Sequence, residues 1–194
     1  MSDLKRIKNV DIYLLDQFFK GNLNSNQRVL DAGFGKGRNL RFCIQEGMDV
    51  KGIDPNPDYV QILSAEFPEL SANIIHSSIE DFIDTEGFDF IICNAVLHFA
   101  KDHKHFDRLI MKLSSLLRED GVLFVRMTSD IGIEEEIEEN DTGVHVIPDQ
   151  STRYLLTREK ITEILAVNKM ELLEPVKTVN VEDIRCMTTL VLKK

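Results

Sequence analysis

The sequence has few cysteines, no tryptophan and no long hydrophobic run. Its three cysteines, Cys43, Cys93 and Cys186, are widely spaced and include no C-x-x-C pair. An odd and scattered set of cysteines does not make a disulfide framework, so we expect buried thiols and a cytoplasmic protein. The longest apolar run, FIICNAVLHFA, has 11 residues and contains Asn94 and His98. It is too short and too polar to cross a bilayer, and the opening MSDLKRIKNVD lacks the apolar core of a signal peptide, so we expect no membrane partner.

Positive charge is also scarce. The 194 residues include 23 Lys+Arg against 33 Asp+Glu, a formal net charge of −10, and no basic stripe with interleaved aromatic residues is present. Such a chain attracts phosphate backbones poorly, so we expect no nucleic-acid partner. No linker rich in proline, glycine or serine divides the sequence. We therefore predict a single domain over residues 1–194, acting as a monomer or homodimer.

Strand-length apolar runs alternate with segments of helical periodicity over the first two thirds of the chain. We predict strands at residues 28–31, 50–54, 73–76, 88–94 and 121–127, and helices at about 38–46, 57–66 and 103–117. This alternation is typical of a parallel sheet with helices on both faces. An amphipathic helix at about 10–19 precedes the first strand, and we expect it to cover an edge or a site.

The pattern changes after Met127. An acidic stretch leads to a predicted helix at about 158–167, which Thr157 can cap. Two β-like runs follow, MELLEPVKTV and CMTTLVL, with only a few residues between them. That connection is too short for a parallel crossover, so the two runs are predicted to pair antiparallel at one edge of the sheet.

Glycine is uncommon, yet three of the ten glycines alternate within VLDAGFGKGRN, residues 29–39. A glycine-rich turn between a strand and a helix lets a ligand approach the backbone, and the free N–H groups at the helix start favour electron-rich atoms. The dinucleotide-binding pattern G-x-G-x-x-G requires its third glycine where Arg38 stands. The loop therefore departs from that pattern, and a turn that binds nothing is the alternative to a ligand site.

The arrangement D-x-G-x-G-x-G, from Asp31 to Gly37, is followed by an acid in VKGIDPNP at the end of the next predicted strand. With the five strand and helix units, FDFIICNAVLHF and the closing antiparallel pair, it resembles the class I S-adenosylmethionine-dependent methyltransferases over nearly the whole chain. The resemblance implies an α/β fold with a seven-stranded, mostly parallel, Rossmann-like sheet and an antiparallel closing hairpin. It also implies S-adenosylmethionine as cofactor. Within the family, GKGRN, GIDPNP and YLLTREKITEIL look most like the small tellurite-resistance-type methyltransferases.

The resemblance implies roles in cofactor binding for a set of residues on the loops that follow the strands. They are Asp31, Gly33, Gly35, Gly37, Arg38, Asp54, Pro55, Ser78, Ile79, Asn94 and Ala95. Asp31 is expected near the methionyl amino group, with Gly33 and Gly35 against the methionyl chain and ribose. Asp54 is expected to accept hydrogen bonds from both ribose hydroxyls. Pro55 beside it offers an apolar surface to the base.

Five of these residues carry expectations of their own. Ser78 stands where the family commonly has an acid that accepts the adenine amine, with Ile79 supplying a backbone N–H and an apolar contact. Asn94 and Ala95 are expected under the methionyl amino group through a backbone carbonyl. Arg38 adds a cation to the first turn of a helix, where cations are disfavoured. Either it meets the methionyl carboxylate, or it forms a surface ion pair or faces solvent.

His98 follows the fourth predicted strand, where the carboxyl edge of the sheet opens into a ligand site. It is the candidate catalytic residue, as a base or a substrate contact; a histidine packed in the wall of the crevice is the alternative. No metal site is predicted with His103 and His105, because no carboxylate or thiol lies at a matching spacing. The sequence NAVL also differs from the Asn/Asp-Pro-Pro-aromatic motif of nucleobase amino methyltransferases. The expected acceptor is therefore a small molecule.

Two other functions stay open from the sequence. A nicotinamide-dependent oxidoreductase would share the first half of the fold, and a non-catalytic nucleoside-binding protein would be compatible with serine at position 78. The acidic segment 129–154 adds a question of its own, since it follows the fifth predicted strand at the edge where ligands bind. It is either a lid that favours cationic or neutral acceptors or a solvated surface loop.

Overall fold

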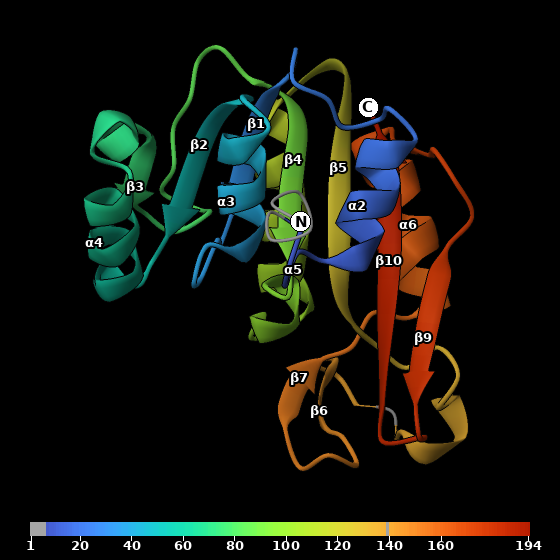
Figure 1. The fold of residues 1–194 in the computed structure, drawn as a ribbon. Coiled ribbons are helices and arrows are strands. Elements are labelled where there is room, and N and C mark those ends of the chain that lie inside the picture. The colour runs from blue at the N-terminus through green and yellow to red at the C-terminus, as the bar shows by residue number, and fades with distance from the viewer. Residues whose placement is uncertain (1–6, 139) are drawn as a thin grey trace. The chain divides into compact units, whose positions relative to one another are not determined.

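The computed structural model describes residues 7–138 and 140–194. Its sheet has the strand order β3-β2-β1-β4-β5-β10, and both β8 and β9 pair with β10 (Figure 1). The strands are β1 (Arg28–Ala32), β2 (Asp49–Asp54), β3 (Ile74–His76), β4 (Phe88–Asn94), β5 (Leu117–Ser129), β8 (Glu171–Leu172), β9 (Lys177–Val181) and β10 (Arg185–Lys193). Pairing is parallel from β3 through β2 and β1 to β4, and antiparallel between β9 and β10. The predicted α/β fold with an antiparallel closing hairpin is confirmed.

The edge strand beside β10 is interrupted. Leu172 of β8 pairs with Leu192, and Lys177 of β9 pairs with Thr189 further back along β10. Between the two segments stands Pro175, which has no backbone N–H to donate to a ladder. Taken together as one interrupted strand, β8 and β9 complete the seven-stranded sheet that was predicted.

The chain forms two compact units. One contains residues 1–92 and 116–122, and the other contains residues 93–115 and 123–194. The division cuts β4 and β5 within their length. It therefore does not decide between one domain and two, and the single domain over 1–194 stays a prediction.

The first unit holds helices α2 (Ile12–Phe19), α3 (Arg38–Gln45) and α4 (Pro57–Glu66) and the 3-10 helix η1 (Pro68–Asn73). Helix α4 lies beside β3 (Figure 1). It begins with Pro57, and the side chain of Asn56 accepts a hydrogen bond of 2.9 Å from the Asp58 amide. Helix α3 packs closely on β2, since a Cβ at Gly52 would lie 2.4 Å from Leu40 Cδ2.

A buried ion cluster joins the amino-terminal part of β1 to the loop before β4. The guanidinium of Arg28 donates to both carboxylate oxygens of Asp84, at 2.9 and 3.0 Å, and lies 4.5 Å from the centre of the Phe88 ring. Lys51 Nζ is 2.9 Å from the same carboxylate. The hydrogen bonds from Arg28 hold the pKa of Asp84 well below its usual range. The cluster therefore ties β1 and β2 to the loop that precedes β4.

The second unit holds most of helix α5 (His103–Leu116), helix α6 (Arg158–Asn168) and the 3-10 helices η2 (Leu97–Phe99) and η3 (Glu134–Glu136). Thr157 caps α6 as predicted, because its side chain accepts a hydrogen bond of 3.0 Å from the Lys160 amide. A short antiparallel hairpin, β6 (Val144–Val146) with β7 (Thr152–Tyr154), was not predicted. Strands of three residues carry too little alternation to be recognised in an acidic segment.

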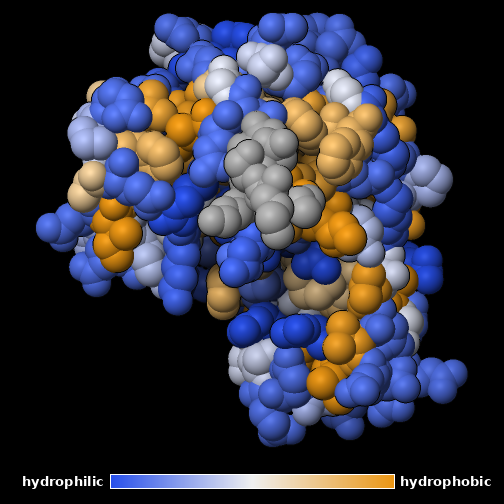
Figure 2. Space-filling view, in the orientation of Figure 1, coloured by the Kyte–Doolittle hydropathy of each residue, from blue (hydrophilic) through white to orange (hydrophobic). Residues whose placement is uncertain are grey.

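The cysteines, the exposed side chains and the lengths of the helices can be compared with what the composition predicts. The three cysteines are free and buried. Hydrophilic side chains cover most of the face drawn in Figure 2. Over the part of the chain that the structure describes, every helix is too short or too polar to traverse a lipid bilayer.

Candidate functional site

The loop after β1 turns through three glycines with left-handed backbone. Gly33, Gly35 and Gly37 have φ angles of 82°, 56° and 77°, which side-chain-bearing residues rarely adopt. The Gly33 amide donates to the Ile53 carbonyl at 2.8 Å, and the Gly35 amide donates to Asp54 Oδ2 at 2.7 Å. The loop is therefore fastened to the carboxyl end of β2.

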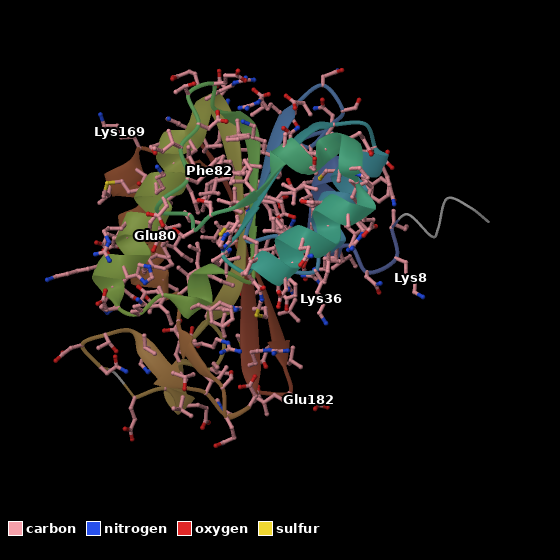
Figure 3. The ribbon with its side chains drawn as sticks, turned by 90° about the vertical axis from the view of Figure 1, so that its left-hand side faces the viewer. Lys8, Lys36, Glu80, Phe82, Lys169 and Glu182 are labelled. Carbon is pink, nitrogen blue, oxygen red and sulfur yellow. The ribbon has the colours of Figure 1, made fainter. Side chains whose placement is uncertain are left out.

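Gly35 and Gly37 face different surroundings. A Cβ at Gly35 would meet no atom within 4 Å, so this glycine borders open space that a ligand can fill. A Cβ at Gly37 would lie 2.8 Å from Leu63 Cδ1 of α4, and Gly37 is also the N-cap of α3. The structure thus gives Gly37 a packing role, while its contact with a cofactor stays a prediction. Lys36 between them is exposed (Figure 3).

Asp54 ends β2 as a buried carboxylate held at both oxygens. Oδ2 accepts from the Gly35 amide at 2.7 Å and Oδ1 accepts from the Asn56 amide at 2.8 Å. A carboxylate oxygen can accept two hydrogen bonds, so each keeps room for one more donor. Pro55 beside it is exposed, and its carbonyl lies 3.0 Å from His76 Nε2. This arrangement fits the two adjacent hydroxyls that Asp54 was predicted to bind.

Asp31, at the buried centre of the same unit, has an oxygen that lacks a partner. The residue is 2% exposed, and Oδ2 accepts no hydrogen bond from any residue that the structure describes. Burial raises the pKa of Asp31 to about 7; the Arg38 charge opposes this shift and the Asp54 charge adds to it. An unpartnered buried carboxylate oxygen is costly unless a donor or cation reaches it. Asp31 therefore fits an ammonium group, as predicted for the methionyl end of the cofactor.

Arg38 forms an ion pair within the protein. Its Nη2 lies 3.5 Å from Asp11 Oδ2, and the Asp11 carboxylate also accepts from the Tyr13 amide at 3.0 Å as the N-cap of α2. The Asp11 amide donates in turn to Asn39 Oδ1 at 3.1 Å. Arg38 thus has an ion-pair partner within the protein, and its contact with the methionyl carboxylate stays a prediction. Asp11 was missed, although an aspartate directly before a helical run is a recognisable cap signal.

The turn after β3 carries Ser78 and Ile79. Ser78 Oγ donates to Asp81 Oδ2 at 2.7 Å and accepts from the Asp81 amide at 3.1 Å. Ile79 is buried, and the Ser77 amide donates to the Asp54 carbonyl at 3.2 Å, which ties this turn to the end of β2. A carboxylate therefore accompanies the serine that stands in place of the family's acid. Sequence reasoning missed Asp81, although an acid three residues after serine is a known capping pattern.

In the second unit, Asn94 is buried and Ala95 has a φ angle of 61°. The Ala95 amide donates to the Arg126 carbonyl at 2.7 Å, which holds this conformation. A non-glycine residue in the left-handed region costs on the order of 1–3 kcal/mol, and such strain is concentrated at functional sites. The strained backbone thus coincides with a position that was predicted to contact the cofactor.

His98 is 7% exposed and lies in η2. Its Nδ1 is 3.0 Å from Thr128 Oγ1, and its ring meets the Phe99 ring edge-on with centroids 4.5 Å apart. Burial lowers the pKa of His98 to about 4, and the charges of Arg153 and Arg185 add to the effect. The imidazole is therefore neutral near pH 7 and a weak base.

The other histidines considered at the sequence level have separate partners. His103 Nδ1 lies 2.9 Å from the Tyr154 hydroxyl, and the Lys101 amide donates to His105 Nδ1 at 3.1 Å. Within residues 7–138 and 140–194, no cluster of three or more His, Cys, Asp or Glu side chains could hold a metal ion.

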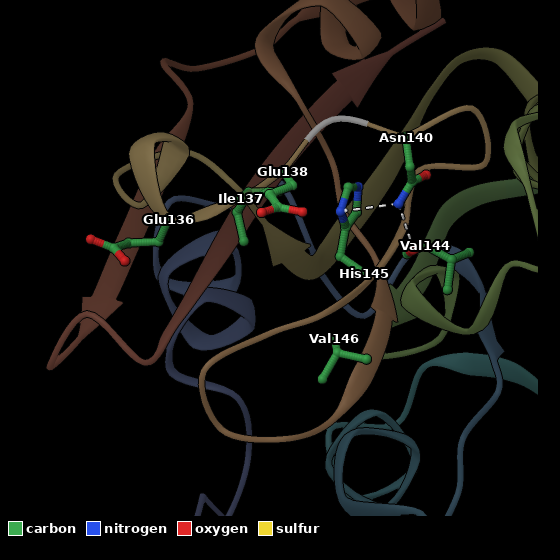
Figure 4. Close-up of a pocket in the computed structure, with 7 residues that line it drawn as sticks. All are labelled: Glu136, Ile137, Glu138, Asn140, Val144, His145 and Val146. Atoms are coloured by element: carbon green, nitrogen blue, oxygen red, sulfur yellow. Dashed lines mark hydrogen bonds between the residues drawn. The ribbon is translucent and has the colours of Figure 1, made fainter.

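The acidic segment after β5 is structured in its described part. Around β6 it forms a hollow of about 380 Å³ lined by Glu136, Ile137, Glu138, Asn140, Val144, His145 and Val146 (Figure 4). Asn140 Nδ2 donates to the Val144 carbonyl at 2.9 Å and lies 3.2 Å from His145 Nδ1. Asp130 begins the segment, and burial raises its pKa to about 6. Whether the segment acts as a lid stays a prediction.

Comparisons with known proteins identify a family. A family model described as a methyltransferase domain matches residues 9–165. The chain is 28% identical over 97 residues to an uncharacterized methyltransferase, Rv3342, of Mycobacterium tuberculosis, and the match covers 50% of this chain and 38% of that protein. It is 30% identical over 106 residues to the uncharacterized methyltransferase C70.08c of Schizosaccharomyces pombe, with 52% and 39% covered. The matches thus span less than half the length of these curated relatives.

Solved structures share the fold at low sequence identity. An S-adenosylmethionine-dependent methyltransferase from Clostridium acetobutylicum has a TM-score of 0.71 and 13% identity, with 96% of this chain and 93% of that chain covered. Magnesium protoporphyrin IX methyltransferase from Synechocystis, solved with S-adenosylhomocysteine, has a TM-score of 0.70 and 18% identity, with 98% and 84% covered. The N-methyltransferase NodS from Bradyrhizobium japonicum has a TM-score of 0.68 and 16% identity, with 100% and 99% covered.

Proposed function

This chain belongs to the methyltransferase-domain family of class I S-adenosylmethionine-dependent proteins, and we propose that it transfers a methyl group from S-adenosylmethionine to a small-molecule acceptor. One observation carries the proposal. The Gly35 backbone borders open space in the unit that also holds the unpartnered oxygen of Asp31 and the carboxylate of Asp54. These residues suit a cofactor that has an ammonium group at one end, for Asp31, and a ribose further along, for Asp54.

In the proposed complex, Asp31 binds the methionyl ammonium and Asp54 binds the ribose hydroxyls. Gly35 leaves room along the methionyl chain, because a Cβ there would meet no atom within 4 Å, and Gly33 stays a predicted contact of the same chain. The bound cofactor supplies an electrophilic methyl group on a sulfonium centre. The ammonium also stabilises the charged form of Asp31, so that binding lowers the pKa of its carboxyl group and releases a proton below about pH 7.

The remaining predicted contacts belong to the same proposal. Ser78 and Asp81 together supply the acceptor for the adenine amine, since the Asp81 carboxylate lies 2.7 Å from the serine hydroxyl. Arg38 Nη2 lies 3.5 Å from Asp11, and the five N–H donors of its guanidinium allow a second carboxylate, so it stays a predicted contact of the methionyl carboxylate. Asn94 and Ala95 stay predicted contacts of the methionyl amino group.

A small acceptor is supported by two observations. The net charge of −10 disfavours nucleic acid. Among the structural neighbours, one is named as a methyltransferase of magnesium protoporphyrin IX, a small molecule. The likeness to tellurite-resistance-type methyltransferases stays a prediction about the subfamily. A thiolate or a chalcogen oxyanion needs no strong base, which suits a site whose histidine has a pKa of about 4. His98 is therefore proposed as a contact to the acceptor.

Equilibrium binding tests the proposal against its alternatives. Calorimetric titration with S-adenosylhomocysteine and, separately, with NADH should show saturable binding of the first and none of the second. Binding of NADH alone would replace the proposal with an oxidoreductase. Mass spectrometry of a co-purified ligand, followed by turnover with methyl-labelled S-adenosylmethionine, would identify the acceptor. Tight binding of S-adenosylhomocysteine with no labelled product from any candidate acceptor would favour a non-catalytic nucleoside-binding protein.

A further inference from the structure

The hydrogen bond between Thr128 and His98 determines which ring nitrogen carries the proton. Thr128 is 1% exposed, and its hydroxyl has His98 Nδ1 as its one hydrogen-bond partner among residues 7–138 and 140–194. If Nδ1 were the donor, the hydroxyl hydrogen would be buried without an acceptor, at a cost of about 1–3 kcal/mol. The hydroxyl therefore donates to Nδ1, and the neutral ring carries its hydrogen on Nε2. His98 consequently offers an N–H donor at Nε2.

An arginine stands beside this histidine on the same aromatic ring. Arg153 Cζ lies 5.0 Å from the centre of the Phe99 ring, whose edge-on neighbour is His98 at 4.5 Å. Arg153 Nη1 donates to the Thr152 carbonyl at 2.8 Å. In the described part of the chain no carboxylate lies within 4 Å of this guanidinium, so its charge has no ion pair. Phe99 itself is 62% exposed and can meet an apolar group.

The nearby acid is already engaged. Asp149 Oδ1 accepts from the Ser151 amide at 2.9 Å and from the Ser151 hydroxyl at 2.5 Å, and Oδ2 lies 3.5 Å from Arg185 Nη1. The charges of Arg153 and Arg185 both lower the pKa of His98, because cations disfavour a further positive charge. The surroundings of His98 are thus electropositive, although the segment that contributes Arg153 is acidic overall.

We infer that the second unit recognises a carboxylate group on the methyl acceptor, with His98 Nε2–H and the Arg153 guanidinium as donors and the Phe99 ring as the apolar contact. A guanidinium binds a carboxylate through two parallel hydrogen bonds, and a neutral N–H adds a directed third donor. The inference rests on the proposed function, because it takes the methyl acceptor to be the ligand of His98. It differs from the lid expected from sequence, which would favour cationic or neutral acceptors, and is compatible with the alternative of a solvated loop at residues 129–154.

Nitrogen NMR of the 194-residue protein tests which ring nitrogen of His98 carries the hydrogen. At pH 7 the ring nitrogens of His98 should show hydrogen on Nε2 and a bare, hydrogen-bonded Nδ1. Thr128→Ser should keep this tautomer, since it keeps the hydroxyl, and Thr128→Val should give a mixture of both tautomers. Hydrogen on Nδ1 in the wild type, or a charged imidazolium at pH 7, would overturn the inference.

Titration with benzoate tests the carboxylate subsite without need of the true acceptor. The probe should bind saturably and shift the His98 and Arg153 signals, and benzamide, its uncharged counterpart, should bind at least tenfold more weakly. Arg153→Ala should weaken benzoate binding by about tenfold or more. Arg158→Ala is the matched control, because this exposed arginine of the same unit pairs with Glu134 at 3.5 Å and should bind benzoate like the wild type.

The outcomes separate this inference from the proposed function. No saturable benzoate binding to the wild type, equal binding of benzamide, or equal loss in Arg153→Ala and Arg158→Ala would overturn the carboxylate subsite. The same variants should keep wild-type affinity for S-adenosylhomocysteine. A wild type that binds benzoate as described and does not bind S-adenosylhomocysteine would keep the subsite and overturn the proposed cofactor.

Discussion

The amide of Gly35 donates a hydrogen bond of 2.7 Å to the carboxylate of Asp54. Gly35 lies in the loop that follows β1 and Asp54 is the last residue of β2, and the same carboxylate also accepts a hydrogen bond of 2.8 Å from the Asn56 amide. The glycine loop is therefore fixed in place by a side chain that is itself proposed to bind the ribose. A site ordered in advance loses less conformational entropy when its ligand binds.

Gly35→Ala should separate backbone strain from loss of ligand volume. Gly35 and Gly47 have φ angles of 56° and 73°, and a Cβ at either position would meet no atom within 4 Å. Alanine at either site should lower the free energy of unfolding by about 1–2 kcal/mol, because both must keep left-handed backbone. Only Gly35→Ala should weaken S-adenosylhomocysteine binding, by about tenfold or more. Urea denaturation and calorimetry give the two quantities, and equal affinities for both variants would make the loop a structural turn only.

Asp31 should make the ligand-free protein less stable as the pH rises. Its folded pKa of about 7 lies above the ordinary value of 3.8, so between these values the folded state binds more protons than the unfolded state. The free energy of unfolding therefore falls from about pH 4 to pH 7 through this group. Asp31→Asn should remove that fall and also weaken S-adenosylhomocysteine binding. Urea denaturation across this pH range measures the first effect, and an unchanged slope in the variant would contradict it.

Proton release offers an independent check on Asp31. If an ammonium group meets this carboxylate, titration with S-adenosylhomocysteine near pH 6 should release protons. Calorimetry in buffers with different ionisation enthalpies measures how many protons are released for each ligand bound. Release in the wild type and none in Asp31→Asn is the expected result, whereas equal release in both would assign the proton to another group.

Asp84→Asn should destabilise the fold without affecting the ligand site. The carboxylate is 3% exposed and binds Arg28 and Lys51. Its loss leaves the buried Arg28 guanidinium with the exposed carboxylates of Asp49 and Glu86, at 3.4 and 3.3 Å, so we expect a cost of about 3 kcal/mol, at the low end for breaking a buried pair. Because its folded pKa is depressed, this contribution is present above the unfolded pKa near 4 and is lost as the pH falls through the folded value. Glu66→Gln, at the exposed pair with Arg41, is the control and should cost less than about 1 kcal/mol. A similar loss of unfolding free energy in both variants would show that the buried cluster stabilises the fold no more than an exposed ion pair does.

Local patterns were sufficient to predict the framework of the fold. The alternating strands and helices, the Thr157 cap and the antiparallel end depend on periodicity, capping and connection length, which are visible within short windows of sequence. The glycine loop and Asp54 were singled out from local patterns too, since the loop directly follows one predicted strand and Asp54 ends the next. The structure brings them together through the hydrogen bond between Gly35 and Asp54.

Contacts between side chains that lie far apart in the sequence could not be predicted from it. The ion pair of Arg38 with Asp11 joins residues 27 positions apart, and the hydrogen bond of His98 with Thr128 joins residues 30 positions apart. Neither spacing follows a helical or strand period, so no local sequence pattern predicts these two contacts. The position of Arg153 could not be predicted either, because the total charge of the acidic segment does not say which of its side chains lies against Phe99.

Calorimetric titration of the wild type, Asp54→Ala and Asp58→Ala with S-adenosylhomocysteine tests the central claim most directly. Asp58 is an exposed acid four residues further along, in the first turn of α4, and serves as the charge-matched control. The account predicts saturable binding to the wild type and to Asp58→Ala, and a loss of roughly 2–4 kcal/mol of binding free energy in Asp54→Ala, where two hydroxyl groups lose a charged acceptor. No binding to the wild type, or equal affinity in all three proteins, would contradict the account.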